Sequence, residues 1–282
     1  MTEWWSGCIS LKGWDVTENP NDADCYVLPP DISHLTNDQL RSLPYLKGNE
    51  TKHVFFSICE NPTRVVGIPA IIFRCDFNKH LLAQGDFGMV WGWGSDDHYS
   101  MYPIQEGFKY DVVFQGQESG LGLTTRAIDS VTKAGLNCKI KVVPMFYGTY
   151  ESRGDKETTT RLKAEYLEGL HQSRLSLCPM SVEGVVRYRF YEALSMGRVP
   201  VLIGDACLLP LADRINYDNC SIRIAEKDVD KTGEILKEWL AGHPDNEILQ
   251  MGLYGYNSFK RWIEDDRWEI TWGELVKERL GL

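Results

Sequence analysis

The sequence lacks the features of several common classes of protein. Its net charge is −10, so it has no basic surplus of the kind that broad binding to nucleic acid or anionic membranes requires. No apolar run approaches the roughly 20 residues that span a bilayer. Residues 1–15 also lack the basic and apolar segments of a signal peptide. We therefore expect a soluble, cytoplasmic protein with no nucleic-acid partner and no transmembrane segment.

The eight cysteines lack the spacing of a metal site or a disulfide framework. No CxxC pair occurs, which excludes the usual zinc spacing. Several lie within or beside apolar runs, where a free cysteine behaves as a small hydrophobe. This pattern indicates a reducing compartment. Internal repeats and low-complexity tails are absent as well.

Short apolar runs bounded by turn residues are what the chain has in quantity. Strands this short and apolar are typical of parallel sheets covered on both faces. The helical patterns between them are long enough to be crossover helices, at 124–134, 158–171 and 187–196. The strand-like runs are 25–28, 54–58, 68–73, 89–93, 112–114, 140–145, 175–178, 199–203 and 221–224. The sequence thus predicts an α/β fold with two doubly wound, Rossmann-like lobes that face a central cleft and bind ligands at the carboxyl ends of their strands.

A polar stretch at 100–109, SMYPIQEGFK, separates the two sets of strands. We expect an N-terminal lobe over residues 1–105 and a second lobe over 106–262. The final segment, 263–282, is expected to form a helix that packs back on the first lobe.

The segment 177–205, LCPMSVEGVVRYRFYEALSMGRVPVLIGD, is the most informative part of the chain. An apolar strand leads through a loop with Ser181 into a helix, and a helix N-terminus suits a diphosphate. Arg187 lies in the first turn, and Arg189 and Glu192, three residues apart, share one flank of the helix. Arginine binds phosphate oxygens, and a carboxylate accepts hydrogen bonds from ribose hydroxyls. From the spacing alone, an ordinary surface pair between Arg189 and Glu192 is the favoured interpretation.

The same segment resembles the core signature of exostosin-type glycosyltransferases, a family of inverting enzymes with the GT-B fold. The matching positions are Arg189, Phe190, Glu192, Ala193, Pro200 and Val201. The chain departs from the family pattern at Arg187, where a small residue is usual, and at Met180. Further elements at 19–30, 43–57, 110–116 and 166–179 resemble the family in the correct order. The ordered set covers most of residues 19–229.

This resemblance implies a nucleotide-sugar transferase. The second lobe would bind a UDP-sugar, the donor substrate, without any cofactor, and a glycan or oligosaccharide would be the acceptor. Arg126 and Arg189 would contact the phosphates, with Arg187 and Ser181 nearby, and Glu192 would take the ribose hydroxyls. Soluble exostosin-like enzymes of bacteria and large algal viruses are similar in layout, which makes xylose one candidate sugar. A catalytically inactive UDP-sugar-binding module and a sugar-nucleotide epimerase of similar fold remain alternatives.

An inverting transfer needs a general base, which should come from a strand end of the first lobe. Asp76 is the first choice, followed by Glu60 and Asp31, because each follows an apolar run. His53, Asp86 and Asp97 are less well placed. Each of these residues taken alone is better explained as a turn or cap residue.

Two DxD pairs, Asp22 with Asp24 and Asp228 with Asp230, are the spacing that holds a metal in other glycosyltransferases. Capping and strand-start roles explain them adequately, so we expect no required metal. Trp91 and Trp93 are candidates for stacking on the acceptor sugar.

Overall fold

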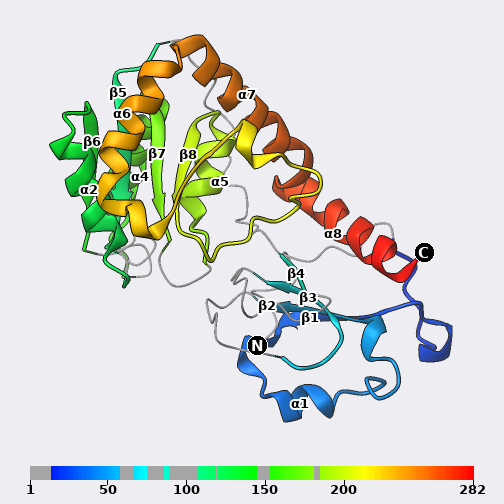
Figure 1. Ribbon diagram of the computed structural model, residues 1–282. Helices are drawn as coiled ribbons and strands as arrows, with labels where there is room; N and C mark the ends of the chain where they lie inside the picture. The colour runs from blue at the N-terminus through cyan, green and yellow to red at the C-terminus, as the bar shows by residue number, and fades with distance from the viewer. Residues whose placement is uncertain are drawn as a thin grey trace.

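The structure is a computed structural model, and it describes residues 14–57, 66–74, 86–88, 107–118, 120–144, 153–180 and 185–282. Two parallel β-sheets lie in separate halves of the molecule, each covered by helices (Figure 1). These two halves, the N-terminal lobe and the C-terminal lobe, confirm the predicted GT-B type α/β fold with two Rossmann-like lobes.

The N-terminal lobe contains four parallel strands in the order β1-β2-β3-β4. They are β1 (Tyr26–Asp31), β2 (His53–Ser57), β3 (Ile71–Arg74) and β4 (Asp86–Gly88), with α1 (Asn37–Arg41) between the first two. Side chains of successive residues enter different cores, as the two-residue period of a strand requires. Phe55 and Ile72 pack with Leu40 of α1 on one face. Phe56 and Phe73 belong to the core on the other face.

The C-terminal lobe contains five parallel strands in the order β6-β5-β7-β8-β9. They are β5 (Tyr110–Gly116), β6 (Cys138–Val142), β7 (Ser173–Pro179), β8 (Val199–Ile203) and β9 (Ile222–Ile224). The helices between them are α2 (Leu123–Lys133), α4 (Lys156–His171) and α5 (Tyr188–Ser195), and α6 (Thr232–Gly242) follows the last strand. Val112 and Phe114 of β5 share a core with α2, whereas Val113 packs with α4 on the opposite face. The sheet is therefore doubly wound. After β6 the chain returns to the other side of β5, so the strand order reverses between β5 and β7.

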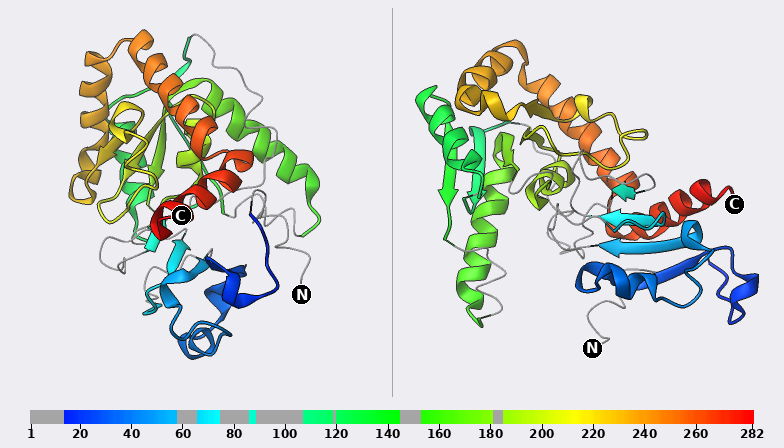
Figure 2. Two further views of the ribbon diagram at one scale, coloured as in Figure 1. Left: turned by 90° about the vertical axis from the view of Figure 1, so that its right-hand side faces the viewer. Right: turned by 60° about the horizontal axis from the view of Figure 1, so that its bottom comes forward.

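Two long helices end the chain, α7 (Asp245–Trp262) and α8 (Asp265–Leu280). α7 packs closely against the turn that follows α5, since a Cβ added at Gly252 would lie 2.1 Å from the carbonyl oxygen of Gly197. α8 then extends along the N-terminal lobe (Figures 1 and 2).

α8 covers the face of the N-terminal sheet that carries Phe56 and Phe73. Its buried residues Trp268, Trp272, Leu275 and Val276 follow the spacing of one helix face. The ring centroids of Trp272 and Phe56 lie 5.6 Å apart, and those of Trp268 and Phe73 lie 6.1 Å apart. The last helix thus serves as a layer of the first lobe.

The predicted elements agree with the structure wherever it describes them. The run 199–203 coincides with β8, and the other described runs lie within a few residues of a strand. The three predicted helices correspond to α2, α4 and α5. The run 89–93 lies outside the described residues, and β4 comes just before it, at Asp86–Gly88.

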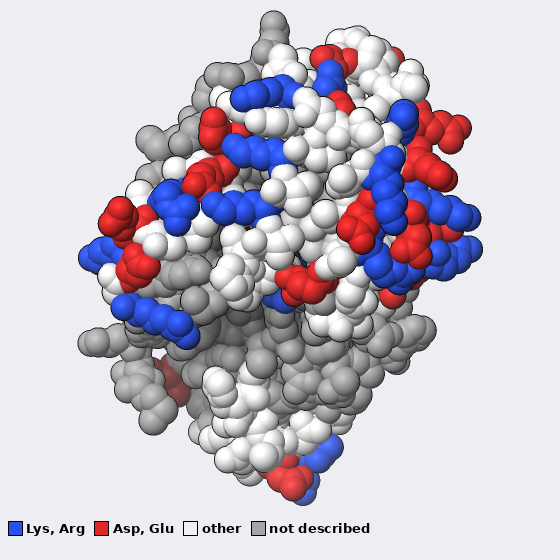
Figure 3. All heavy atoms as spheres, turned by 90° about the vertical axis from the view of Figure 1, so that its left-hand side faces the viewer, with Lys and Arg blue, Asp and Glu red and all other residues white. Residues whose placement is uncertain are grey.

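Positive and negative side chains alternate over the outer face of the C-terminal lobe (Figure 3). Lys139 pairs with Glu168, Lys141 with Glu165, and Arg126 with Asp230. Among the described residues, this face therefore carries no extended patch of a single charge. Within the same described ranges, none of the helices has both the length and the apolar character needed to cross a bilayer.

Candidate functional site

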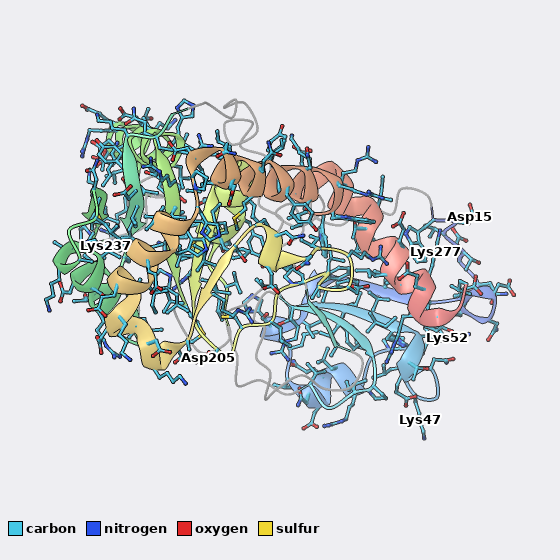
Figure 4. The ribbon with its side chains drawn as sticks, turned by 45° about the horizontal axis from the view of Figure 1, so that its top comes forward. Asp15, Lys47, Lys52, Asp205, Lys237 and Lys277 are labelled. Atoms are coloured by element: carbon cyan, nitrogen blue, oxygen red, sulfur yellow. The ribbon has the colours of Figure 1, made fainter. Side chains whose placement is uncertain are left out.

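The point where the C-terminal sheet reverses its strand order is the natural place for a ligand. In doubly wound sheets, ligands bind outside the carboxyl ends of the strands at this position. Here the reversal separates β5, which ends at Gly116, from β7, which ends at Pro179. The helices that follow these strands, α2 and α5, both begin on this side of the sheet. Asp205, just past the end of β8, marks the same edge in Figure 4.

Arg189 reaches this position from the first turn of α5. Its guanidinium carbon lies 4.6 Å from the ring centroid of Phe114, and its Nη2 donates a long hydrogen bond, 3.4 Å, to the carbonyl oxygen of Gln115. Gly116 makes this approach possible, because a Cβ there would lie 1.9 Å from Nη2. The Nε of Arg189 is buried and has no hydrogen-bond partner in the described part of the chain. The Arg189 guanidinium is thus held at the strand end where the strand order reverses, and its Nε can still donate a hydrogen bond to a ligand.

Glu192 lies one turn further along α5 and contacts α4. Tyr166 of α4, which is buried, donates its hydroxyl to the Glu192 carboxylate. Burial lowers the pKa of Lys163, also on α4, and the nearby Glu192 carboxylate partly offsets that effect. Among the described contacts, Arg189 makes no ion pair with Glu192. The described hydrogen bonds of the two side chains lead to different neighbours, Gln115 for Arg189 and Tyr166 for Glu192.

Arg126 occupies the first turn of α2 and is already paired. Its Nε and Nη2 donate to the two carboxylate oxygens of Asp230, at 2.9 and 2.6 Å. Both side chains are about half exposed or more, so the pair is a weak, solvent-screened one. Arg126 nevertheless holds the pKa of the Asp230 carboxyl below its usual range. A phosphate could recruit this guanidinium only in competition with Asp230.

The other predicted site residues fall partly within the described part of the chain. Ser181, Glu60 and Asp76 lie outside the described residues, as do Asp97, Trp91 and Trp93. Arg187 is the N-cap residue of α5 and is partly buried. Asp31 is the last residue of β1, at the carboxyl edge of the N-terminal sheet, where a base is expected. Asp86 begins β4 and so lies at the opposite, amino edge.

The second DxD pair does not cap a helix as predicted. Asp228 is the third residue of a short 3-10 helix, η5 (Glu226–Lys231), whose N-cap residue is Ala225. Asp228 pairs with Lys231 at 3.8 Å, and Asp230 pairs with Arg126. In the first pair, Asp22 accepts a hydrogen bond from Asn19. Among the described residues, no three or more His, Cys, Asp or Glu side chains come together as a metal site would require.

Sequence reasoning missed Lys163, Tyr166 and Gly116 as parts of this site. Tyr166 begins the helical segment that resembles the exostosin family, but its partner lies 26 residues away and on another helix. Gly116 carried one available signal, its position at the end of an apolar strand, where a glycine permits close approach of another group. Cys178, between these elements, is a structural residue because burial raises the pKa of its thiol to about 12.

Comparisons with known proteins show what the C-terminal lobe is similar to. Residues 110–239 match the Exostosin GT47 domain. A probable glycosyltransferase of Arabidopsis thaliana is 34% identical over 99 residues, which cover 35% of this chain and 20% of that protein. A probable glucuronosyltransferase of Oryza sativa subsp. japonica is 32% identical over 33% of this chain and 21% of its own length. A probable beta-1,4-xylosyltransferase of Arabidopsis thaliana is 36% identical over 25% of this chain and 17% of its own length.

The matched segments thus span about a fifth of the length of these plant relatives. Among solved structures, a glycosyltransferase from Rickettsia africae aligns with a TM-score of 0.48 and 10% identity, over 84% of this chain and 73% of that one. The matched family segment begins at the first residue of β5 and ends within α6, so it contains Arg126, Arg189 and Glu192. Residues 110–239 of the C-terminal lobe are therefore similar to the Exostosin GT47 domain.

Proposed function

We propose that this chain is an inverting glycosyltransferase that moves a sugar from a UDP-sugar to a glycan acceptor. The observation that carries the proposal is the placement of Arg189 at the strand-order reversal of a lobe that is similar to the Exostosin GT47 domain. A guanidinium at this position meets the diphosphate of a nucleotide bound across the carboxyl ends of the strands.

Glu192 and Tyr166 supply the second half of the donor site in this proposal. The carboxylate accepts hydrogen bonds from the ribose hydroxyls, and Tyr166 holds it in place from α4. Lys163 adds a cation close to the same carboxylate. The plant relatives include a probable glucuronosyltransferase and a probable beta-1,4-xylosyltransferase, so UDP-glucuronic acid and UDP-xylose are the first donors to test.

In the transfer step, the acceptor lies between the donor sugar and the N-terminal lobe. The acceptor oxygen attacks the anomeric carbon from the face opposite the diphosphate, and a C–O bond forms as the bond to the leaving oxygen breaks. UDP leaves with the electron pair, and a carboxylate of the N-terminal lobe takes the acceptor proton. Asp76, Glu60 and Asp31 remain the candidates for that base, and Asp31 lies at the carboxyl end of β1. Positive charge from the arginines stabilises the leaving diphosphate, and the proposal includes no metal.

Calorimetric titration with UDP tests the donor site. Arg189→Ala and Glu192→Gln should each weaken UDP binding by about 1.5–3 kcal/mol, the worth of a hydrogen bond to a charged group. Arg41→Ala and Glu168→Gln are matched controls, because both residues belong to exposed ion pairs elsewhere. Wild-type affinity in both site variants would contradict the donor assignment.

Product analysis tests the reaction. An α-linked UDP-sugar should give a β-linked product in the presence of EDTA, with the linkage read by NMR. UDP binding without transfer to any acceptor would identify an inactive binding module, and a change in the free UDP-sugar would identify an epimerase. Retention of configuration would contradict the inverting mechanism.

A further inference from the structure

The N-terminal lobe contains a cavity of about 580 Å³ that the proposed transfer site does not use. Its wall is formed by the chain that leads into β1, by Leu43–Tyr45 and by His53. Tyr26 and His53 are the first residues of β1 and β2. The cavity thus lies at the amino edge of the sheet. The donor and the general base are expected at the carboxyl edges of the two sheets, so this cavity is separate from the proposed transfer site.

Three stacked rings form one side of the cavity. The rings of Tyr26 and His53 lie 4.8 Å apart at an interplanar angle of 19°, and those of Tyr26 and Tyr45 lie 6.0 Å apart at 11°. His53 is buried, whereas Tyr45 is 58% exposed. The Tyr26 hydroxyl donates to the carbonyl oxygen of Pro20 at 2.8 Å, and His53 Nδ1 lies 2.9 Å from the carbonyl oxygen of Asn49. The two inner rings are fixed, and the outer ring presents an aromatic surface to solvent.

The backbone holds Tyr45 in an unusual conformation. Its φ of 61° falls in the left-handed region, which is costly for a bulky residue. Asn49 stabilises this turn by donating from Nδ2 to the Tyr45 carbonyl oxygen at 3.2 Å. The strained backbone leaves more than half of this large aromatic side chain exposed to solvent. Such strain is typical of ligand-contact positions.

Trp14 adds a fourth aromatic ring to the wall of the same cavity. One face of its indole stacks on Trp272 of α8, with centroids 5.6 Å apart at 7°, and Lys277 lies 5.0 Å from its ring centroid. α8 therefore fixes the position of this wall. Figure 4 shows Asp15 near Lys277 at this end of the molecule.

The charged groups of the wall are all acidic. Asp15, Glu18, Asp22 and Asp24 line the cavity, and no lysine or arginine does so among the described residues. Carboxylates accept hydrogen bonds from hydroxyls, and aromatic faces pack against the apolar C–H face of a sugar ring. The same carboxylates repel phosphates and acidic sugars.

From this combination we propose that the aromatic cavity is a second carbohydrate-binding site, selective for neutral sugar units of a glycan. Tyr45 and Trp14 stack on the sugar, and the carboxylates accept hydrogen bonds from its hydroxyls. Only the expectation that the bound glycan is the acceptor chain rests on the proposed function. The binding itself is independent of UDP.

Calorimetric titration with neutral hexasaccharides (xylohexaose, cellohexaose and mannohexaose) tests the site, with tetragalacturonate as the anionic probe. At least one neutral hexaose should bind, and tetragalacturonate should bind at least about tenfold more weakly. Tyr45→Gly should weaken the neutral ligand at least about tenfold, because it removes the ring while glycine accepts the left-handed backbone without strain. Tyr45→Phe keeps the ring and should stay within about twofold of the wild type.

Tyr256→Ala is the matched control, because it removes a tyrosine of α7 that lies outside the cavity. It should leave the affinity for the hexaose unchanged. Melting temperatures of all variants check that the fold is intact. Absence of binding to all three neutral probes, equal binding of the anionic probe, or full affinity in Tyr45→Gly would each overturn the proposal.

A competition experiment separates this site from the donor site. Saturating UDP should leave hexaose affinity unchanged, and Arg189→Ala should bind the hexaose as the wild type does. Hexaose binding that depends on Tyr45 in a chain that binds no UDP would reject the proposed function and keep the cavity assignment. UDP binding with no hexaose binding would reject the cavity assignment and keep the proposed function.

Discussion

Two arginines of the C-terminal lobe are held in opposite ways. Arg198 is 1% exposed and donates to four backbone carbonyl oxygens at the ends of α4 and α5, those of Leu170, His171, Met196 and Gly197. Burial lowers its pKa to about 10, so it remains charged at neutral pH. Arg189, at the other edge of the sheet, has a buried Nε with no described partner. Arg198 caps helices, whereas Arg189 keeps donor capacity for a ligand.

Gly116 provides a test of Arg189 that leaves its charge in place. In Gly116→Ala, the new Cβ would lie 1.9 Å from Arg189 Nη2, the mobile end of a long side chain, so the guanidinium should move and the fold should survive. We expect UDP affinity, measured by calorimetry, to fall about tenfold, or about 1.4 kcal/mol. Gly242→Ala in α6 is the control, since a Cβ there meets nothing within 4 Å. Unchanged UDP affinity in Gly116→Ala would mean that the position of Arg189 does not matter for binding.

At the scale of elements, the pairing of α2 with η5 decides whether Arg126 is available. Asp230→Asn removes the charge that holds the Arg126 guanidinium. If Arg126 contacts the diphosphate, this change should tighten UDP binding by a few tenths to 1 kcal/mol, the worth of an exposed pair. Arg126→Ala should weaken UDP binding, and Asp38→Asn, in an exposed pair with Arg41, is the control. Equal UDP affinity in all these variants would leave Arg126 as a surface residue.

Local patterns predicted the elements of this fold well. The strand 199–203 is a continuous apolar run, and its burial on both faces makes that pattern sufficient. The position of Arg189 and Glu192 on a helix after such a strand was predictable for the same reason. The neighbours of these two residues were not, because Tyr166 and Gln115 come from other elements. Contacts of this kind depend on how the elements pack, which no local pattern records.

At the scale of the whole molecule, α8 joins the two lobes into one hydrophobic core. Phe56 and Phe73 of the first sheet and the tryptophans of α8 belong to the same buried cluster as Phe114 of the second sheet. Arg214 of the C-terminal lobe reinforces this connection. It pairs with Glu278 and Glu274 of α8 and stacks over Trp262 at 5.2 Å.

This arrangement predicts that the stability of the N-terminal lobe depends on a helix that ends the chain. Trp272 is 1% exposed and packs against Trp14, Phe56 and Phe73. Trp272→Ala should therefore cost about 3–5 kcal/mol, the usual cost of removing a large buried aromatic side chain. Because the loss falls on the contact with the first sheet, the N-terminal lobe should unfold at a lower temperature than the C-terminal lobe. Calorimetry should then show two transitions in place of one.

UDP identifies which transition belongs to which lobe. At 100 times its dissociation constant, UDP stabilises the state that binds it by about 2.7 kcal/mol. In Trp272→Ala it should raise only the upper transition, because the donor site lies in the C-terminal lobe. Ile270→Ala, at an exposed position of the same helix, should behave as the wild type. A single transition in Trp272→Ala that UDP raises as a whole would show that α8 is not what couples the lobes, and that they hold together through other contacts.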